Sequence, residues 1–150
     1  MKNKKGAEIM IKLIKAEYNE QTGVSYVNIN TSYGEFEGYA KLHAEDNDIA
    51  SRYAGCQYAE QRAVLKYMKH RIKILAWQIQ ALNNCQNQIK GRVTYNPNSV
   101  ESRALRKQIF ILQNEKKDWQ SRYNSLYSKL LKDMNDRKTI IESFKKEDKE

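Results

Sequence analysis

The sequence predicts an α+β fold, in which an N-terminal three-stranded antiparallel β-meander is followed by a long antiparallel two-helix hairpin. The apolar residues follow a period of two before residue 43, and alternating steps of three and four after residue 48. Breakers are scarce, with one proline and six glycines in 150 residues, so long uninterrupted elements are expected. This length suits one domain with a modest core, and we predict a single domain over 1–150.

Residues 9–42 are predicted to form the meander, because the turn-rich segments NEQTG and SYG separate three strand-like runs. Val27 and Ile29 alternate with polar neighbours, which indicates one buried face. The apolar set of the first strand changes phase between Leu13 and Ile14, which predicts a β-bulge. The third strand repeats the alternation with Phe36, Gly38, Ala40 and Leu42.

The first helix is predicted over 46–90, with Asp46 or Asp48 as its N-cap. Its apolar seam follows a heptad pattern with one polar member: Leu65, Met68, Ile72, Leu75, Ile79, Leu82, Gln86 and Ile89. A second stripe has small side chains that would let another backbone approach, such as the underside of the sheet: Cys56, Ala59 and Ala63.

A loop over 91–98 is predicted to lead into the second helix, 99–146. Its seam keeps the same spacing with three polar members, so we expect weaker burial toward its end: Leu105, Ile109, Leu112, Lys116, Trp119, Tyr123, Leu126, Leu130, Asp133, Arg137, Ile140 and Phe144. Six aromatic residues fall outside both seams and need another partner surface: Tyr53, Tyr58, Tyr67, Trp77, Phe110 and Tyr127. We therefore expect a homo-oligomer, either a dimer or a larger ring.

The formal charge of +9, from 27 Lys and Arg against 18 Asp and Glu, suits anionic partners such as nucleic acid, nucleotides or a membrane surface. Alternatively, the lysines only keep a long helical surface soluble. Cys56 and Cys85 would stand roughly 43 Å apart on one helix, too far for an intramolecular disulfide. With neither a signal peptide nor a run of ~20 apolar residues, we expect a cytoplasmic protein without a membrane partner.

No catalytic motif stands out, and we predict neither an enzyme nor a metal or cofactor site. His43 lies near Glu45, Asp46 and Asp48, a combination that suits a metal site or an acid–base pair. A strand-to-helix corner rich in capping residues accounts for the same residues, and we favour that interpretation.

The start of the second helix is the candidate anion site. Asn96 before Pro97 suits an N-cap, and Asn98 with Glu101 in a capping box is the alternative. Either start points free amides and the positive end of the helix dipole toward the loop.

Four side chains gather around this helix start. Arg103 and Arg106 share a face, and Arg92 and Tyr95 approach from the loop, so phosphate oxygens and a stacked base would fit there. Alternatively, the arginines pair with Glu101 or with a neighbouring subunit. A second basic group is expected to spread around the first helix as a solvated surface: Lys66, Lys69, Arg71 and Lys73.

The stretch GEFEGYAKLHAEDNDIASRYAGCQYAEQRAVLKYMK contains F-x-G-x-A, an acidic corner and then G-x-x-x-A-x-x-R-A. Together with the helical hairpin and the NPNS loop, it resembles the Thoeris anti-defence sponge family of phage proteins. The resemblance implies an N-terminal antiparallel sheet, two long antiparallel helices and an oligomer with ligand pockets between subunits. It also implies ligand contacts from the loop and the following helix start: Arg92, Tyr95, Asn98, Ser99, Arg103 and Arg106.

The resemblance further implies a phage anti-defence protein in the host cytoplasm. Such a protein would sequester cyclic ADP-ribose signals, and cyclic oligonucleotides as a further ligand class, without cleaving them. The alternative function is a basic nucleic-acid-binding protein, or a phage inhibitor of a host nuclease or a CRISPR complex. A purely structural oligomer is the third hypothesis.

Overall fold

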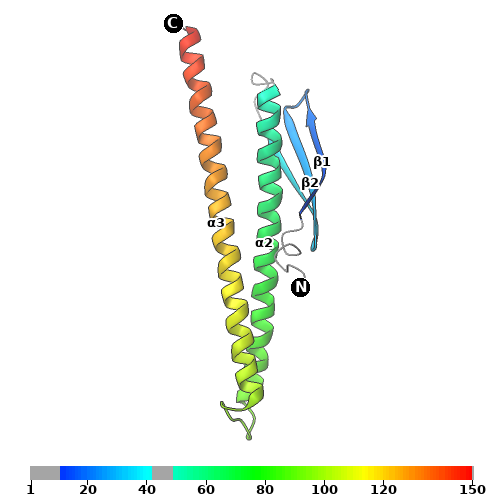
Figure 1. Ribbon diagram of the computed structural model, residues 1–150, viewed down its shortest axis with the longest axis vertical. Helices are drawn as coiled ribbons and strands as arrows, with labels where there is room; N and C mark the ends of the chain where they lie inside the picture. Colours follow the sequence, from blue (N-terminus) through cyan, green and yellow to red (C-terminus); the bar gives the residue numbers. More distant parts are fainter. Residues whose placement is uncertain (1–10, 42–48, 150) are drawn as a thin grey trace, which may run out of the picture. The chain divides into compact units, whose positions relative to one another are not determined.

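The computed structural model describes residues 11–41 and 49–149, which form three strands and two long helices (Figure 1). The strands are β1 (Lys12–Asn19), β2 (Val24–Thr31) and β3 (Gly34–Lys41), and the helices are α2 (Ile49–Lys90) and α3 (Val100–Lys149). The predicted α+β class and order of elements are confirmed, whereas the homo-oligomer stays a prediction.

The chain divides into two compact units. Unit 1 comprises Met1–Tyr67 and Asn124–Glu150, and therefore contains the sheet, the beginning of α2 and the end of α3. Unit 2 comprises Met68–Tyr123, with the rest of both helices and the loop that joins them.

The sheet is an antiparallel meander in the order β1-β2-β3. In the first turn, the Asn19 Oδ1 atom accepts hydrogen bonds from the amides of Gln21 (2.9 Å) and Thr22 (3.3 Å). Gly23 completes this turn at a φ of 72°, in the left-handed region that favours glycine. The pairing register of β1 on β2 shifts between Leu13 and Lys15, which confirms the predicted bulge.

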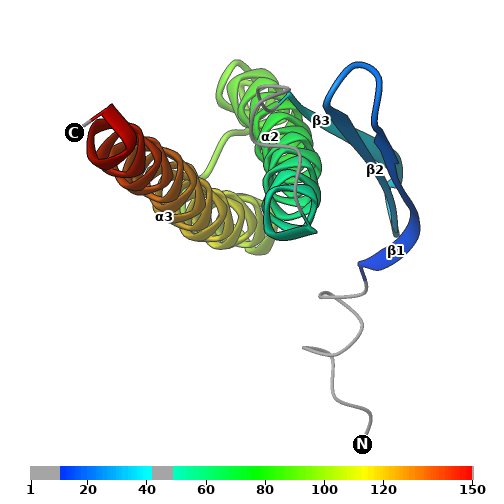
Figure 2. The same cartoon turned by 90° about the horizontal axis from the view of Figure 1, so that it is seen from above.

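One face of the sheet packs against the part of α2 that belongs to unit 1 (Figures 1 and 2). The β2 side chains Val27 and Ile29 are 1% and 0% exposed, and burying each contributes about 1.5–3 kcal/mol. Gly38 of β3 lies directly on the helix. A Cβ atom at this position would collide with the Ala59 carbonyl oxygen and lie 2.7 Å from the Ala63 amide nitrogen. The small-residue stripe therefore receives the sheet backbone, as predicted.

The two predicted seams are the inward faces of the helices. On α2, seam residues Leu65, Leu75 and Ile89 are buried and the other predicted members are half-buried. On α3, every seam residue from 105 to 137 is buried or half-buried, including the polar members. The predicted seam residues 140 and 144 lie beyond the side chains that the structure describes.

Two aromatic residues that we expected to need a separate partner surface are buried in unit 1. Tyr67 is 2% exposed, and its ring meets Phe36 at 5.7 Å and Tyr33 at 6.4 Å between centroids. Tyr58 is 7% exposed and donates a hydrogen bond to the Asp133 carbonyl oxygen at 3.3 Å. Our expectation was wrong for these two, because the sheet and the end of α3 cover them.

Candidate functional site

The N-cap of α3 is Ser99, rather than Asn96 or Asn98. The Ser99 Oγ atom accepts a hydrogen bond from the Ser102 amide at 3.2 Å, and the Ser99 carbonyl oxygen accepts the first helical bond from the Arg103 amide at 3.0 Å. The third helical position is therefore Ser102, not Glu101. The predicted capping box is wrong by one residue, because the Asn96 side chain bonds the Asn98 amide within the loop and the helix therefore starts after Ser99.

The asparagine before the proline organises the loop instead. The Asn96 Oδ1 atom accepts a hydrogen bond from the Asn98 amide at 2.9 Å, and the Asn96 carbonyl oxygen accepts one from the Ser102 hydroxyl at 3.1 Å. The Ser102 and Ser99 hydroxyls also lie 3.0 Å apart. This network fixes the backbone that precedes α3, and it occupies Ser99, one of the predicted ligand contacts.

The predicted basic residues fall into two groups. Arg92 forms an ion pair with Glu101 at 3.6 Å, and both side chains are more than half exposed, so the pair contributes little to stability. Arg103 and Arg106 are exposed, and neither guanidinium group has an ion-pair or hydrogen-bond partner among the described side chains, those of residues 11–41 and 53–138. Tyr95, which lies between Arg92 and Arg103 in the sequence, is half-buried.

The geometry of this helix start favours an anion. The amides of Val100 and Glu101 precede the first amide that bonds within the helix, so they remain available to a ligand. The positive end of the helix dipole adds to this preference, and Arg103 and Arg106 belong to the first two turns of α3. The Glu101 carboxylate opposes it, although Arg92 partly neutralises that charge.

The second basic group differs from our expectation. Arg71 turns inward, with a side chain only 11% exposed, and contacts Glu115 at 3.6 Å and the Trp119 ring at 4.8 Å. Lys69 and Lys73 instead share an exposed face of α2 with Trp77, at steps of four residues. The Lys73 ammonium group lies 5.0 Å from the centre of the Trp77 ring, and that ring is 60% exposed. The lysines therefore form a basic stripe with an aromatic residue, which our sequence interpretation missed.

The residues behind the family resemblance pack against one another in unit 1. Gly38 of F-x-G-x-A lies on Ala59 and Ala63 of G-x-x-x-A-x-x-R-A. The arginine of the second motif, Arg62, donates a hydrogen bond to the Tyr39 carbonyl oxygen at 2.7 Å. These two motifs therefore position the sheet on α2, which is a structural role that needs no ligand.

The described residues can also be compared with the requirements of a metal site and of a membrane span. Among the side chains that the structure describes, no three potential His, Cys, Asp or Glu ligands come together. His43 and its acidic neighbours lie outside the described residues. Cys56 and Cys85 both lie on α2 as free thiols. Neither described helix has an apolar stretch long enough to span a bilayer.

No protein-family model, curated protein or solved structure matches this chain. Membership of the Thoeris sponge family therefore stays a prediction.

Proposed function

We propose that this protein captures a small phosphate-bearing nucleotide at the start of α3 and holds it without cleaving it. The observation behind the proposal is that the Arg103 and Arg106 guanidinium groups are exposed and bind no described carboxylate. Guanidinium groups bind phosphate oxygens through two parallel hydrogen bonds, so this pair suits a phosphate ligand.

The loop contributes the remaining contacts in this proposal. The two open amides at Val100 and Glu101 would bind one phosphate, as helix starts commonly do. The half-buried ring of Tyr95 would stack on the base, and Asn98 lies exposed on the same loop. Arg92 would exchange its weak pairing with Glu101 for a phosphate oxygen.

Calorimetry tests the proposal with cyclic ADP-ribose isomers and cyclic oligonucleotides as ligands. We expect a saturable heat with at least one of them, and about a 10-fold weaker affinity for each arginine replaced in Arg103→Gln and Arg106→Gln. The matched control is the double variant Lys129→Gln, Lys132→Gln, which removes two exposed charges elsewhere on α3.

Three results would contradict the proposal: no heat with any of these nucleotides, equal losses in the control, or unchanged affinity in the arginine variants. Mass spectrometry of small molecules released by heating the purified protein identifies a co-purifying ligand. Recovery of the added nucleotide intact supports capture, whereas recovery of a cleaved product would show an enzyme.

The biological role that we propose is phage anti-defence in the host cytoplasm, with the captured nucleotide being an immune signal. This role rests on the sequence resemblance and on the anion preference of the α3 start. Assembly into a homo-oligomer is part of the same proposal. Trp77 and Phe110, which are 60% and 62% exposed, are the apolar surfaces that such an assembly would cover.

Nucleic-acid binding is a second candidate, favoured by the basic stripe of Lys69, Lys73 and Trp77. Lysines that bind phosphates next to an exposed aromatic ring are typical of single-strand binding. A gel shift would show an affinity that falls steeply with added salt and that weakens in Lys69→Gln and Trp77→Ala. If the affinity for nucleic acid did not change with salt or with these substitutions, the basic stripe would be ruled out as the binding surface.

A further inference from the structure

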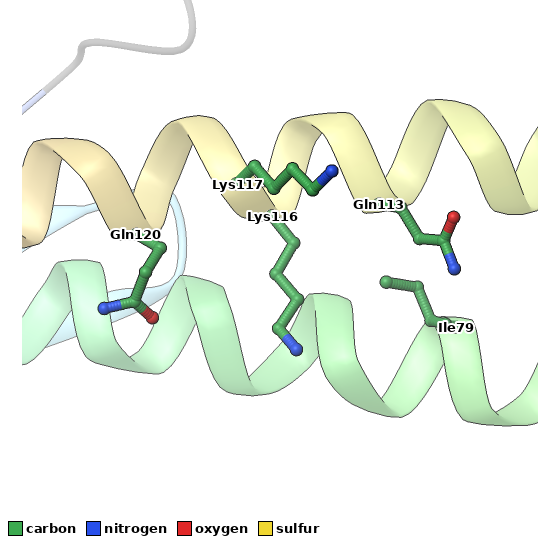
Figure 3. Close-up of a pocket in the computed structure, with 5 residues that line it drawn as sticks. All are labelled: Ile79, Gln113, Lys116, Lys117 and Gln120. Carbon is green, nitrogen blue, oxygen red and sulfur yellow. The ribbon is translucent and has the colours of Figure 1, made fainter.

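Unit 2 contains a groove between α2 and α3 with a volume of about 510 Å³ (Figure 3). One apolar and four polar side chains line it: Ile79 from α2, and Gln113, Lys116, Lys117 and Gln120 from α3. This volume falls within the range of small-molecule sites, roughly 300–1,000 Å³. None of the six residues predicted to bind a ligand lines the groove.

The two lysines of the groove lack an acidic partner in the described chain. No lining residue is acidic. The two carboxylates that flank the lysines in sequence are bound elsewhere: Glu115 pairs with Arg71 at 3.6 Å, and Asp118 pairs with Arg122 at 3.0 Å. The positive charge of Lys116 and Lys117 is therefore left uncompensated beside the groove.

The two arginines of these pairs also contact one buried aromatic ring. Trp119 is 7% exposed, and the guanidinium groups of Arg71 and Arg122 lie 4.8 Å and 5.1 Å from its centre. Each of these cation–ring contacts is favourable, because the faces of the ring are electron-rich. The arginines that pair with Glu115 and Asp118 therefore also contact Trp119.

Lys116 occupies a position where the heptad pattern calls for an apolar residue. It follows Leu112 in the α3 seam, is half-buried, and extends from α3 toward α2 (Figure 3). A charged group in such a position costs stability through lost hydration. A bound anion would offset this cost.

We propose that the groove binds a small diphosphate-type anion. The ammonium groups of Lys116 and Lys117 would contact the oxygens of two neighbouring phosphates, since lysine binds phosphate as a compact positive charge. The side-chain amide of Gln113 would donate a further hydrogen bond. Ile79 supplies an apolar floor for the uncharged part of a larger ligand. This site shares no residue with the start of α3, and the inference is independent of the proposed function.

The test uses inorganic pyrophosphate as the probe, with the full chain at low ionic strength. Calorimetry should show saturable binding of pyrophosphate, and weaker binding of orthophosphate and sulfate. Each of Lys116→Gln and Lys117→Gln should weaken pyrophosphate binding by about 10-fold. In the unaltered protein, nuclear magnetic resonance should show that the side-chain amide signals of Gln113 and Gln120 shift on titration.

Two controls separate this site from general charge and from the α3 start. The variant Lys129→Gln, Lys132→Gln loses the same charge and should bind pyrophosphate within about 2-fold of the unaltered protein. Arg103→Gln with Arg106→Gln should also retain this binding, even if nucleotide capture is lost. The inference is overturned if pyrophosphate does not bind, if the glutamine amide signals stay fixed at saturation, or if the control variant loses as much affinity as the groove variants.

Discussion

Substituting Gly38 by alanine should loosen the sheet from α2. The added Cβ atom would lie 2.7 Å from the Ala63 amide nitrogen and 2.9 Å from the Ala59 carbonyl carbon, and closer still to the Ala59 carbonyl oxygen. Ordinary contact begins near 3.4 Å, so the strand must move by at least ~0.7 Å from Ala63. All three atoms belong to the helix backbone, and no rotation of a side chain can relieve the collision.

The cost follows from overpacking, which typically amounts to about 1–3 kcal/mol. Gly38 does not have a positive φ, so alanine brings no backbone strain and gains about 0.4–1 kcal/mol from a stiffer unfolded chain. We expect a net loss of about 1.3 kcal/mol in the free energy of unfolding, and a decrease of about 3–5 °C in Tm. Urea denaturation followed by circular dichroism measures the loss, and hydrogen exchange of the β2 amides locates it.

The matched control is Gly91→Ala. A Cβ atom there would meet only the Gln88 and Asn87 carbonyl oxygens, at 3.5 Å and 3.7 Å, which is ordinary contact. We expect its stability to stay within about 0.5 kcal/mol of the unaltered protein. If Gly38→Ala were equally stable, with unchanged exchange of the β2 amides, the close packing of β3 on α2 would be refuted.

Three further predictions concern the helix start and the aromatic residues. Ser99→Ala should cost about 1 kcal/mol in the free energy of unfolding through loss of the N-cap, whereas Asn98→Ala should stay within about 0.5 kcal/mol; equal losses would refute the cap assignment. Acrylamide should quench the fluorescence of Trp77 much more than that of Trp119, because their exposed fractions are 60% and 7%. The fluorescence of Trp77 is measured in the variant Trp119→Phe, and that of Trp119 in the variant Trp77→Phe. Burial raises the pKa of Tyr58 above its ordinary value of 10.0, so the fold favours the neutral phenol and its contribution to stability should be lost as the pH rises past 10. Tyr58→Phe should reduce this alkaline loss in urea denaturation at pH 8 and pH 10.5, and an unchanged loss would contradict the assignment.

The sequence predicted the fold well where the spacing of apolar and small side chains indicates which face of an element is buried. The alternating steps of three and four identified the inward faces of both helices, including the polar seam positions Lys116 and Asp133. The change of phase after Leu13 predicted the bulge in β1. The small side chains at Ala59 and Ala63 predicted the approach of another backbone, since small residues on one face leave room for it.

Sequence reasoning failed where several neighbouring residues can perform the same role. Asn96, Asn98 and Ser99 are all good N-caps, and only the loop geometry selects Ser99. The burial of Tyr58 and Tyr67 depends on elements that are distant in sequence, which a local pattern does not reveal.

The candidate site was predicted only in part, for a related reason. Exposed cations follow from composition, but their pairing depends on tertiary contacts. The pairing of Arg92 with Glu101 was foreseen as an alternative. The inward turn of Arg71 was not foreseen, because a basic residue on a charged helix gives no local signal of which way it faces. The steps of four from Lys69 to Lys73 and Trp77 were a signal that could have identified the basic stripe.

The bulge in β1 also bears on how the protein avoids aggregation. β1 forms an edge of the described sheet, where unpaired backbone groups would accept a strand from another molecule. The interruption at Ile14 breaks the regular spacing of these groups, and the exposed charge of Lys12 disfavours pairing with another strand. The bulge thereby makes the β1 edge a poor template for pairing with a strand of another molecule.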